Sequence, residues 1–140
     1  MTKVQFVHID KDVVIAFATI CKQNGVRHFQ PLGAVGTNSK SQAFYLRIKG
    51  ELEEALMALN FERLSLFQPS IILTPTNRYG IQQALTLALW TVLLPSLFGR
   101  SHNYHGVPVD TLGAAMAKQL VIGGSDVQRL RWDDFEALTE

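Results

Sequence analysis

Cysteine is scarce in this sequence, and neither sign of charge dominates. The 140 residues include a single cysteine, Cys21, so no disulfide can form within the chain, and we expect a reducing compartment, the cytoplasm. Thirteen lysines and arginines stand against twelve acidic residues, which leaves a net charge of +1. Because the sequence has no basic stripe and no acidic block, we expect no nucleic-acid partner.

Long hydrophobic runs are also missing. The most apolar stretch, residues 84–98 (ALTLALWTVLLPSLF), is shorter than the roughly 20 residues that a membrane-spanning helix needs, and Pro95 interrupts it. The N-terminal segment MTKVQFVHID lacks the apolar core of a signal peptide. We therefore expect no membrane span and interpret residues 84–98 as a buried helix or a substrate-side lid, with a membrane-surface role as the alternative.

A glycine-rich phosphate-binding turn is the third absence. A nucleotide-binding α/β unit normally opens with a strand and a G-x-G-x-x-G turn, where the N-terminus of a helix holds the pyrophosphate. Gly33-x-x-Gly36 follows a predicted strand, but it lacks the third glycine and leads into a loop. The sequence therefore carries no signature for the pyrophosphate end of a dinucleotide.

The elements that are present alternate between helix and strand. A first helix, capped by Asp10 or Asp12 and ended by Gly25, is followed by a strand, a helix, a strand broken at Gln68-Pro69, and a helix, over residues 26–35, 41–58, 63–73 and 81–94. Residues 107–109 are expected to be extended, 111–121 helical, and the acidic tail one or two helical turns. This order predicts a single α/β domain over residues 1–140 with parallel strands flanked by helices.

One spacing suggests chemistry. Tyr45 and Lys49 are four residues apart in the predicted helix 41–58, so both side chains lie on the same face. A phenol is a poor acid–base catalyst at neutral pH, but a nearby ammonium stabilises the phenolate and lowers its pKa. Such a tyrosine can exchange a proton with a carbonyl or alcohol oxygen during hydride transfer. Taken alone, the spacing fits an amphipathic tyrosine beside a solvated lysine better than it fits a catalytic pair.

The surrounding sequence adds to this pair. The segments GVRHF (25–29), FYLRIKGELEEAL (44–56), LNFERLSLFQPSIIL (59–73) and NYHGVPVDTLGAAMAKQLV (103–121) together resemble the atypical short-chain dehydrogenases/reductases related to the Tat-interacting-protein-like oxidoreductases. The resemblance extends from about residue 6 to residue 121. It implies a partial Rossmann-like, NAD(P)-binding α/β domain that corresponds to the C-terminal half of the family fold and lacks its first strands.

The resemblance also implies roles for individual residues. Tyr45 would be the general acid–base residue, and Lys49 would bind the nicotinamide ribose and tune Tyr45. Pro69, Ser70 and Ile71 would approach the nicotinamide end of NADP or NAD. The apolar helix 81–94 and the loop through His105 would form part of the substrate side.

The sequence departs from the family pattern in three places. The family serine at the end of the strand falls on Gly33, beside Ala34, and both stay among the predicted cofactor-binding residues. Gln68 stands where the family has an arginine before Pro-Ser. The glycine-rich N-terminal half of the family is absent, so we expect the 140-residue chain to be weakly active or inactive alone.

Three classes of function follow. The first is an NAD(P)-dependent oxidoreductase acting on an unidentified small molecule, and the second is a non-catalytic binding or regulatory half-domain of the same fold. The third is a structural remnant. Because missing strands would leave an edge and apolar faces of the sheet uncovered, we expect a homo-oligomer or a partner chain that supplies the missing half. No metal site is predicted, since His102-x-x-His105 has no carboxylate or cysteine near it in sequence.

Overall fold

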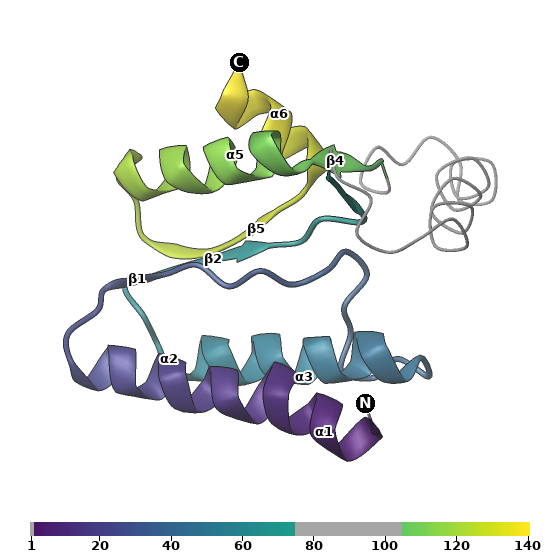
Figure 1. Ribbon diagram of the computed structural model, residues 1–140. Helices are drawn as coiled ribbons and strands as arrows, with labels where there is room; N and C mark the ends of the chain where they lie inside the picture. Colours follow the sequence, from purple (N-terminus) through teal and green to yellow (C-terminus); the bar gives the residue numbers. More distant parts are fainter. Residues whose placement is uncertain (1, 75–104) are drawn as a thin grey trace.

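A three-stranded parallel sheet with helices on both faces forms the centre of the computed structural model, which describes residues 2–74 and 105–140. The strands are β1 (His28–Phe29), β2 (Arg63–Phe67) and β5 (Asp126–Leu130), in the spatial order β1-β2-β5. Helices α1, α2 and α3 lie on one face of this sheet, and α5 and α6 lie on the other (Figure 1). The structure thus confirms the predicted α/β class of parallel strands flanked by helices, consistent with a partial Rossmann-like fold.

The first helix begins earlier than predicted. It consists of α1 (Lys3–Val7), a π-helical turn η1 (His8–Asp12) and α2 (Val13–Gln23). Thr2 caps it, because its hydroxyl accepts a bond from the Gln5 amide while the Gln5 side chain accepts one from the Thr2 amide. The prediction that Asp10 or Asp12 caps this helix was therefore wrong, since both lie within the helical segment. The helix ends as predicted before Gly25, whose φ of 82° suits glycine.

The strands are shorter than predicted, and one was missed. The strand expected over residues 26–35 reduces to β1, after which a single bridge joins Leu32 to Phe67. The strand expected over residues 63–73 breaks at Gln68-Pro69, as predicted, into β2 and β3 (Ile72–Leu73); β3 pairs in parallel with β4 (Val107–Pro108). The missed strand is β5, which pairs with β2 along its whole length.

The remaining predicted helices agree with the structure where it describes them. They are α3 (Phe44–Ala58), α5 (Val109–Val121) and α6 (Trp132–Thr139). Within residues 2–74 and 105–140, no helix is long and apolar enough to cross a membrane. The apolar stretch 84–98 and the predicted helix 81–94 lie outside the described residues.

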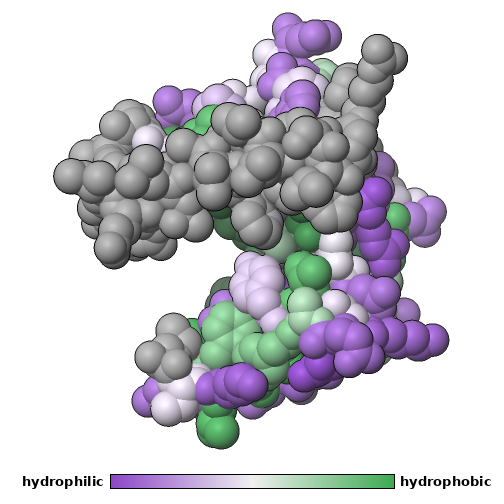
Figure 2. Space-filling view, turned by 90° about the vertical axis from the view of Figure 1, so that its right-hand side faces the viewer, coloured by the Kyte–Doolittle hydropathy of each residue, from purple (hydrophilic) through white to green (hydrophobic). Residues whose placement is uncertain are grey.

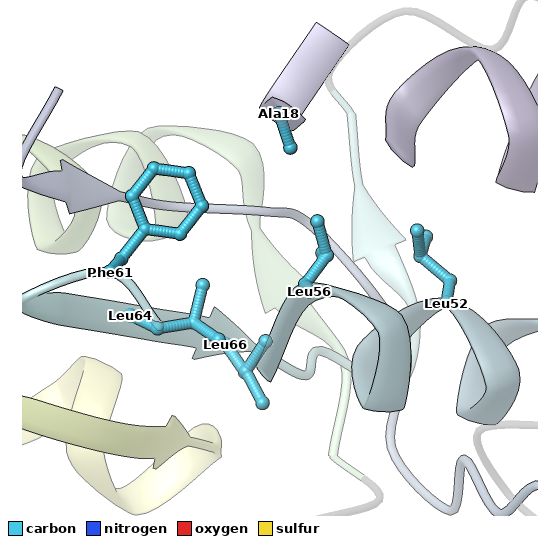
Figure 3. Packing of buried hydrophobic residues seen from close by; sticks show 6 residues of the cluster. All are labelled: Ala18, Leu52, Leu56, Phe61, Leu64 and Leu66. Carbon is cyan, nitrogen blue, oxygen red and sulfur yellow. The ribbon is translucent and has the colours of Figure 1, made fainter. Parts of the chain in front are cut away.

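Each face of β2 packs against a separate hydrophobic cluster, because successive side chains of a strand point to opposite faces. Toward α2 and α3, six buried residues pack together (Figure 3): Ala18, Leu52, Leu56, Phe61, Leu64 and Leu66. Toward α5 and α6, the buried residues are Phe67, Val107, Leu112, Ala115, Leu130 and Phe135. The rings of Phe67 and Phe135 stack with their centroids 5.8 Å apart. The sheet therefore has a covered core on both sides, as parallel sheets require.

A glycine fixes the loop between β1 and α3 against the helix. A Cβ atom on Gly50 would lie 2.3 Å from the Ser39 amide nitrogen and 2.4 Å from the Asn38 carbonyl carbon. The Asn38 amide also donates to the Leu46 carbonyl, at 3.1 Å. Only glycine permits this close approach, because it has no Cβ atom. Gly50 therefore allows the loop that follows β1 to pack directly against α3.

Candidate functional site

The candidate site lies at the carboxyl ends of the parallel strands. The chain leaves β1 and β2 at the same edge of the sheet, and α3 begins at that edge (Figure 1). In open α/β sheets, ligands bind in the crevice outside the carboxyl ends of the strands. Tyr45 is the second residue of α3, so the fold places it at this edge.

Tyr45 and Lys49 lie on one face of α3, as the spacing predicts. The Lys49 ammonium nitrogen is 5.8 Å from the centroid of the Tyr45 ring, within cation–π range. Tyr45 is 46% exposed, whereas only 11% of the Lys49 side chain is exposed. The phenol is therefore accessible to a ligand, and the ammonium lies largely beneath it.

Asp10 also belongs to this group, a contact that was not predicted from the sequence. One Asp10 carboxylate oxygen accepts a hydrogen bond from Lys49 Nζ at 2.9 Å, which forms a partly buried ion pair between the first helix and α3. Asp10 lies in the π-helical turn, and such turns occur frequently at functional sites. Asp10 was expected as a helix cap because the helix was predicted to begin there, whereas the helix begins at Lys3.

An aromatic side chain of the first helix packs against the exposed tyrosine. The Phe6 ring lies 5.7 Å from the ring of Phe44 and 5.7 Å from that of Tyr45. Figure 2 views the molecule from this edge and shows apolar side chains gathered on the lower helical layer. A surface cavity of about 500 Å³ lies on that layer, and it is lined by Lys3, Val4, Val7, His8, Asp12 and Phe44. The cavity adjoins Phe44, the residue next to Tyr45 in α3, and the Phe6 ring gives Tyr45 an apolar neighbour.

Apart from Lys49, the predicted cofactor-binding residues lie on two segments that the structure brings together. The Gly33 amide donates to the Phe67 carbonyl at 2.8 Å, and the Val35 amide donates to the Pro69 carbonyl at 3.0 Å. The segment 33–35, with Ala34, thus runs beside the segment 67–69 at the carboxyl edge of the sheet. Ser70 and Ile71 continue the second segment.

Ser70 and Ile71 are tied to the segment that enters β4. The Ser70 hydroxyl donates to the His105 carbonyl at 2.5 Å, and the Ile71 carbonyl accepts from the Val107 amide at 2.8 Å. The His105 imidazole contacts the Trp132 ring edge-on, with centroids 5.2 Å apart. Ser70 is therefore engaged with protein backbone in this structure.

The structure does not join the pair directly to these segments. Among the described residues, no hydrogen bond or ring contact links Tyr45 or Lys49 to Gly33, Ala34 or the segment 69–71. The two groups share the carboxyl edge of the sheet and are separated by the loop 36–43. Their proposed common role thus needs a ligand that reaches both.

Gln68, the residue that departs from the family arginine, has a defined partner. Its amide nitrogen lies 2.9 and 3.0 Å from the two oxygens of the buried Glu53 carboxylate and 3.2 Å from the Thr37 hydroxyl. Its amide oxygen accepts from Arg131 Nε at 3.1 Å. Gln68 thereby links α3 to α6 through the end of β2. An arginine at this position would face the same carboxylate, which sequence reasoning could not identify.

Gly33 packs close to the same carboxylate. A Cβ atom on Gly33 would lie 3.1 Å from Glu53 Oε1 and 3.6 Å from the Phe67 carbonyl oxygen. A serine could fit here only with a small movement of the flexible Glu53 side chain. Among residues 2–74 and 105–140, no group of three or more histidine, cysteine or acidic residues is arranged to hold a metal ion; His102 lies outside that part of the chain.

Comparison with known proteins identifies homologues. The chain is 33% identical over 125 residues to Protein HTATIP2 of Rattus norvegicus, which covers 89% of the chain and 50% of that protein. It is 37% identical over 113 residues to Protein FMP52-1, mitochondrial, of Scheffersomyces stipitis, covering 81% and 48%. It is 29% identical over 114 residues to Protein FMP52, mitochondrial, of Saccharomyces cerevisiae, covering 78% and 49%.

The chain therefore spans about half the length of the curated relatives that it matches. No family model matches the sequence. Two of these relatives are named as mitochondrial, so the cytoplasmic location expected from the single cysteine stays a prediction for this chain.

Proposed function

We propose that this chain carries the nicotinamide side of an NAD(P)-dependent oxidoreductase of the atypical short-chain dehydrogenase type. Three findings support the proposal: the resemblance of the motifs around Tyr45 and Lys49, the homology to HTATIP2 and FMP52 proteins, and the parallel α/β fold. The observation that carries it is local. An exposed phenol stands over a largely buried ammonium at the carboxyl edge of a parallel sheet.

The described residues fit the nicotinamide ribose better than they fit the phosphates. A lysine ammonium has three N–H donors, and Asp10 is the only acceptor of Lys49 among the described residues. Two donors are therefore available for the hydroxyls of a ribose. At the carboxyl edge of β1 and β2, the segments 33–35 and 69–71 would pack against the planar nicotinamide ring. The sequence contains no G-x-G-x-x-G turn for the pyrophosphate.

The proposed chemistry assigns a step to each side chain. The bound nicotinamide would exchange a hydride with the carbon of a carbonyl or alcohol substrate. Tyr45 would donate its phenolic proton to the carbonyl oxygen during reduction and accept a proton from the alcohol during oxidation. The positive charge of Lys49 would favour the phenolate left after donation, and Asp10 would hold Lys49 in place. Asp10 is thus proposed as a positioning residue.

The activity of the whole relatives does not transfer directly to this chain. Because the 140 residues contain no glycine-rich turn, we infer that a further segment or chain must bind the cofactor phosphates for efficient turnover. We expect the chain alone to bind the dinucleotide at micromolar strength and to be weakly active or inactive.

Calorimetric titration with NADPH and then NADH tests the proposal. We expect micromolar binding, weakened about tenfold by Lys49→Ala, because charged hydrogen bonds to the ribose are worth roughly 1.5–3 kcal/mol. Lys11→Ala is the matched control, since Lys11 also joins the first helix to α3, through a 2.9 Å ion pair with Glu51. Absence of binding, or equal weakening in both variants, would contradict the proposed site.

A second candidate function is that of a non-catalytic, associating half-domain. One observation favours it: among the described residues β1 pairs only with β2, so its other edge has no strand partner. Exposed apolar side chains also follow the first helix, namely Val4, Ile9, Val13, Phe17 and Ile20. Uncovered edges and apolar faces favour association with a second copy or with a chain that supplies further strands.

Sedimentation velocity of the purified chain tests this second candidate. We expect a species larger than the monomer, and we expect Phe17→Glu to shift the distribution toward the monomer. A monomer that persists as the concentration is raised would argue against association. Binding of NADPH by a monomeric chain would favour the oxidoreductase proposal alone.

A further inference from the structure

A second cavity lies at the amino ends of the same strands, opposite the candidate site. The loops that lead into β1, β2 and β5 meet at this edge (Figure 1). The cavity has a volume of about 280 Å³ and is lined by Arg27, His28, Glu62, Arg63 and residues 120–124. Nothing in the proposed oxidoreductase chemistry uses this edge of the sheet.

Arg63 forms the floor of this cavity and is only 6% exposed. One terminal nitrogen of its guanidinium donates to the Ile122 carbonyl, and the other lies 3.5 Å from the Gln128 side-chain oxygen. Its Nε atom is buried and has no hydrogen-bond partner among the described residues. A buried, charged donor without an acceptor is costly, so an acceptor from a ligand would be favoured here.

The neighbouring polar groups do not supply the missing acceptor. The Gln128 side-chain oxygen already accepts from Gln119 Nε2 at 2.7 Å. The Ser65 hydroxyl is engaged by His28 Nε2 at 2.9 Å and by Gln119 Nε2 at 3.3 Å. This network is complete without Arg63 Nε.

The charges around the cavity favour an anion. Arg27 lies exposed on the rim, and no side chain among the described residues forms an ion pair with it. Among the residues that line the cavity, Glu62 contributes one negative charge against the two positive charges of Arg27 and Arg63; Asp126, the register partner of Arg63, is not one of them. Gly124 lies over the guanidinium, since a Cβ atom there would be 3.7 Å from Arg63 Cζ. A larger residue at Gly124 would cover the guanidinium.

We propose that this cavity binds a small oxyanion, with Arg63 Nε as the buried donor and Arg27 as the rim donor. Arginine binds carboxylate and phosphate through paired, charge-assisted N–H bonds, and either group meets the requirement of this cavity. The ligand would bridge the loops before β1, β2 and β5. The site would be separate from the nicotinamide site, on the opposite edge of the sheet.

The proposal is tested by following the amide chemical shifts of the full chain during titration with inorganic phosphate and, separately, with succinate. Chloride replaces the oxyanion in the reference samples, so that the ionic strength stays constant. We expect saturable shifts at Gly123 and Gly124 for the oxyanion that fits, and none at Ala34. Arg27→Gln should weaken that binding about tenfold, the effect of losing one charge-assisted bond. Arg129→Gln, which removes the same charge from an exposed position on β5, should leave it unchanged.

Arg63→Lys provides the second variant, because it keeps the charge but removes Nε–H. We expect it to abolish the saturable shifts; where it fails to fold, the Arg27→Gln comparison decides alone. Absence of saturation with both oxyanions would overturn the proposal. Equal weakening by Arg27→Gln and Arg129→Gln would also overturn it, because the attraction would then be a general effect of charge.

Discussion

Helices α3 and α5 cover opposite faces of one sheet, and each contains one glycine and one buried polar side chain. In α3 the glycine is Gly50, which contacts the backbone of the loop at Asn38 and Ser39; in α5 it is Gly113, whose Cβ position faces open space. The buried polar residue of α3 is Glu53, which holds Gln68 at the carboxyl end of β2. The buried polar residue of α5 is Gln119, which donates to the Ser65 hydroxyl and to the Gln128 side-chain oxygen. Both acceptors lie nearer the amino ends of β2 and β5 than Gln68 does.

The difference shows that α3 is built around the carboxyl edge, whereas α5 mainly covers the sheet. On α3, the exposed Tyr45, the ion-paired Lys49, the loop-packing Gly50 and the buried Glu53 all connect to neighbouring segments. On α5, Leu112 and Ala115 fill a core, and its C-terminal end leaves Leu120 and Val121 exposed. Four comparisons test this contrast.

The largest expected effect is that of alanine at the two glycines. Gly50→Ala should destabilise the protein by about 3 kcal/mol or more, because the new methyl group would overlap the loop backbone. Gly113→Ala should instead stabilise it by about 0.5–1 kcal/mol through helix propensity. Urea unfolding followed by circular dichroism measures both. Similar changes for the two variants would remove the proposed distinction between the helices.

The buried polar residues are expected to differ next. Gln68→Leu should cost about 2–3 kcal/mol, because it leaves the buried Glu53 carboxylate without its amide donor. Gln119→Leu should cost about 1 kcal/mol, because Ser65 keeps His28 and Gln128 keeps Arg63 as partners. Urea unfolding measures both free-energy changes. A larger loss of stability for Gln119→Leu than for Gln68→Leu would contradict this prediction.

The ion pairs of α3 should contribute less. Asp10→Asn should lower the free energy of unfolding by about 1 kcal/mol, and Glu51→Gln by a few tenths, about what exposed pairs contribute. The Lys49–Asp10 side chains are 11% and 29% exposed, against 22% and 36% for Lys11–Glu51. Increasing the salt concentration should reduce the effect of Glu51→Gln more than that of Asp10→Asn. A larger effect of salt on Asp10→Asn than on Glu51→Gln would show that the Lys49–Asp10 ion pair is not the better shielded of the two.

The smallest expected effect is a pH dependence on the α5 side of the sheet. Burial, and then the neighbouring charge of Arg63, lower the pKa of His28 below its usual 6.5. The folded state therefore binds fewer protons than the unfolded state below pH 6.5. Stability from neutral His28 should be fully present above that pH and decline as the pH falls through it. His28→Gln should remove this part of the slope in unfolding curves; an unchanged slope would refute the assignment.

The sequence predicts features that depend on local periodicity. The helical repeat in residues 41–58 places Tyr45 and Lys49 on one face, as the structure shows, and the Gln68-Pro69 break divides the strand at the right residues. Strand β5 was missed because DVQRL is mostly polar and exposed, so it lacks the apolar signal of a buried parallel strand.

Features that depend on distant contacts could not be predicted. Asp10 pairs with a lysine 39 positions away, on a different helix. The partner of Gln68 is a carboxylate on α3, and the need for glycine at position 50 arises from a loop that the helix itself does not contain. Each of these requires the packing of α3 against its neighbours.

We propose above all that the carboxyl edge of the sheet holds a nicotinamide site centred on Tyr45 and Lys49. Amide chemical-shift mapping of the full chain during titration with NADPH tests it most directly. We predict saturable shifts at Tyr45, Lys49, Gly33 and the segment 70–71. Shifts confined to Gly123 and Gly124 at the opposite edge, or no shifts at all, would contradict the claim.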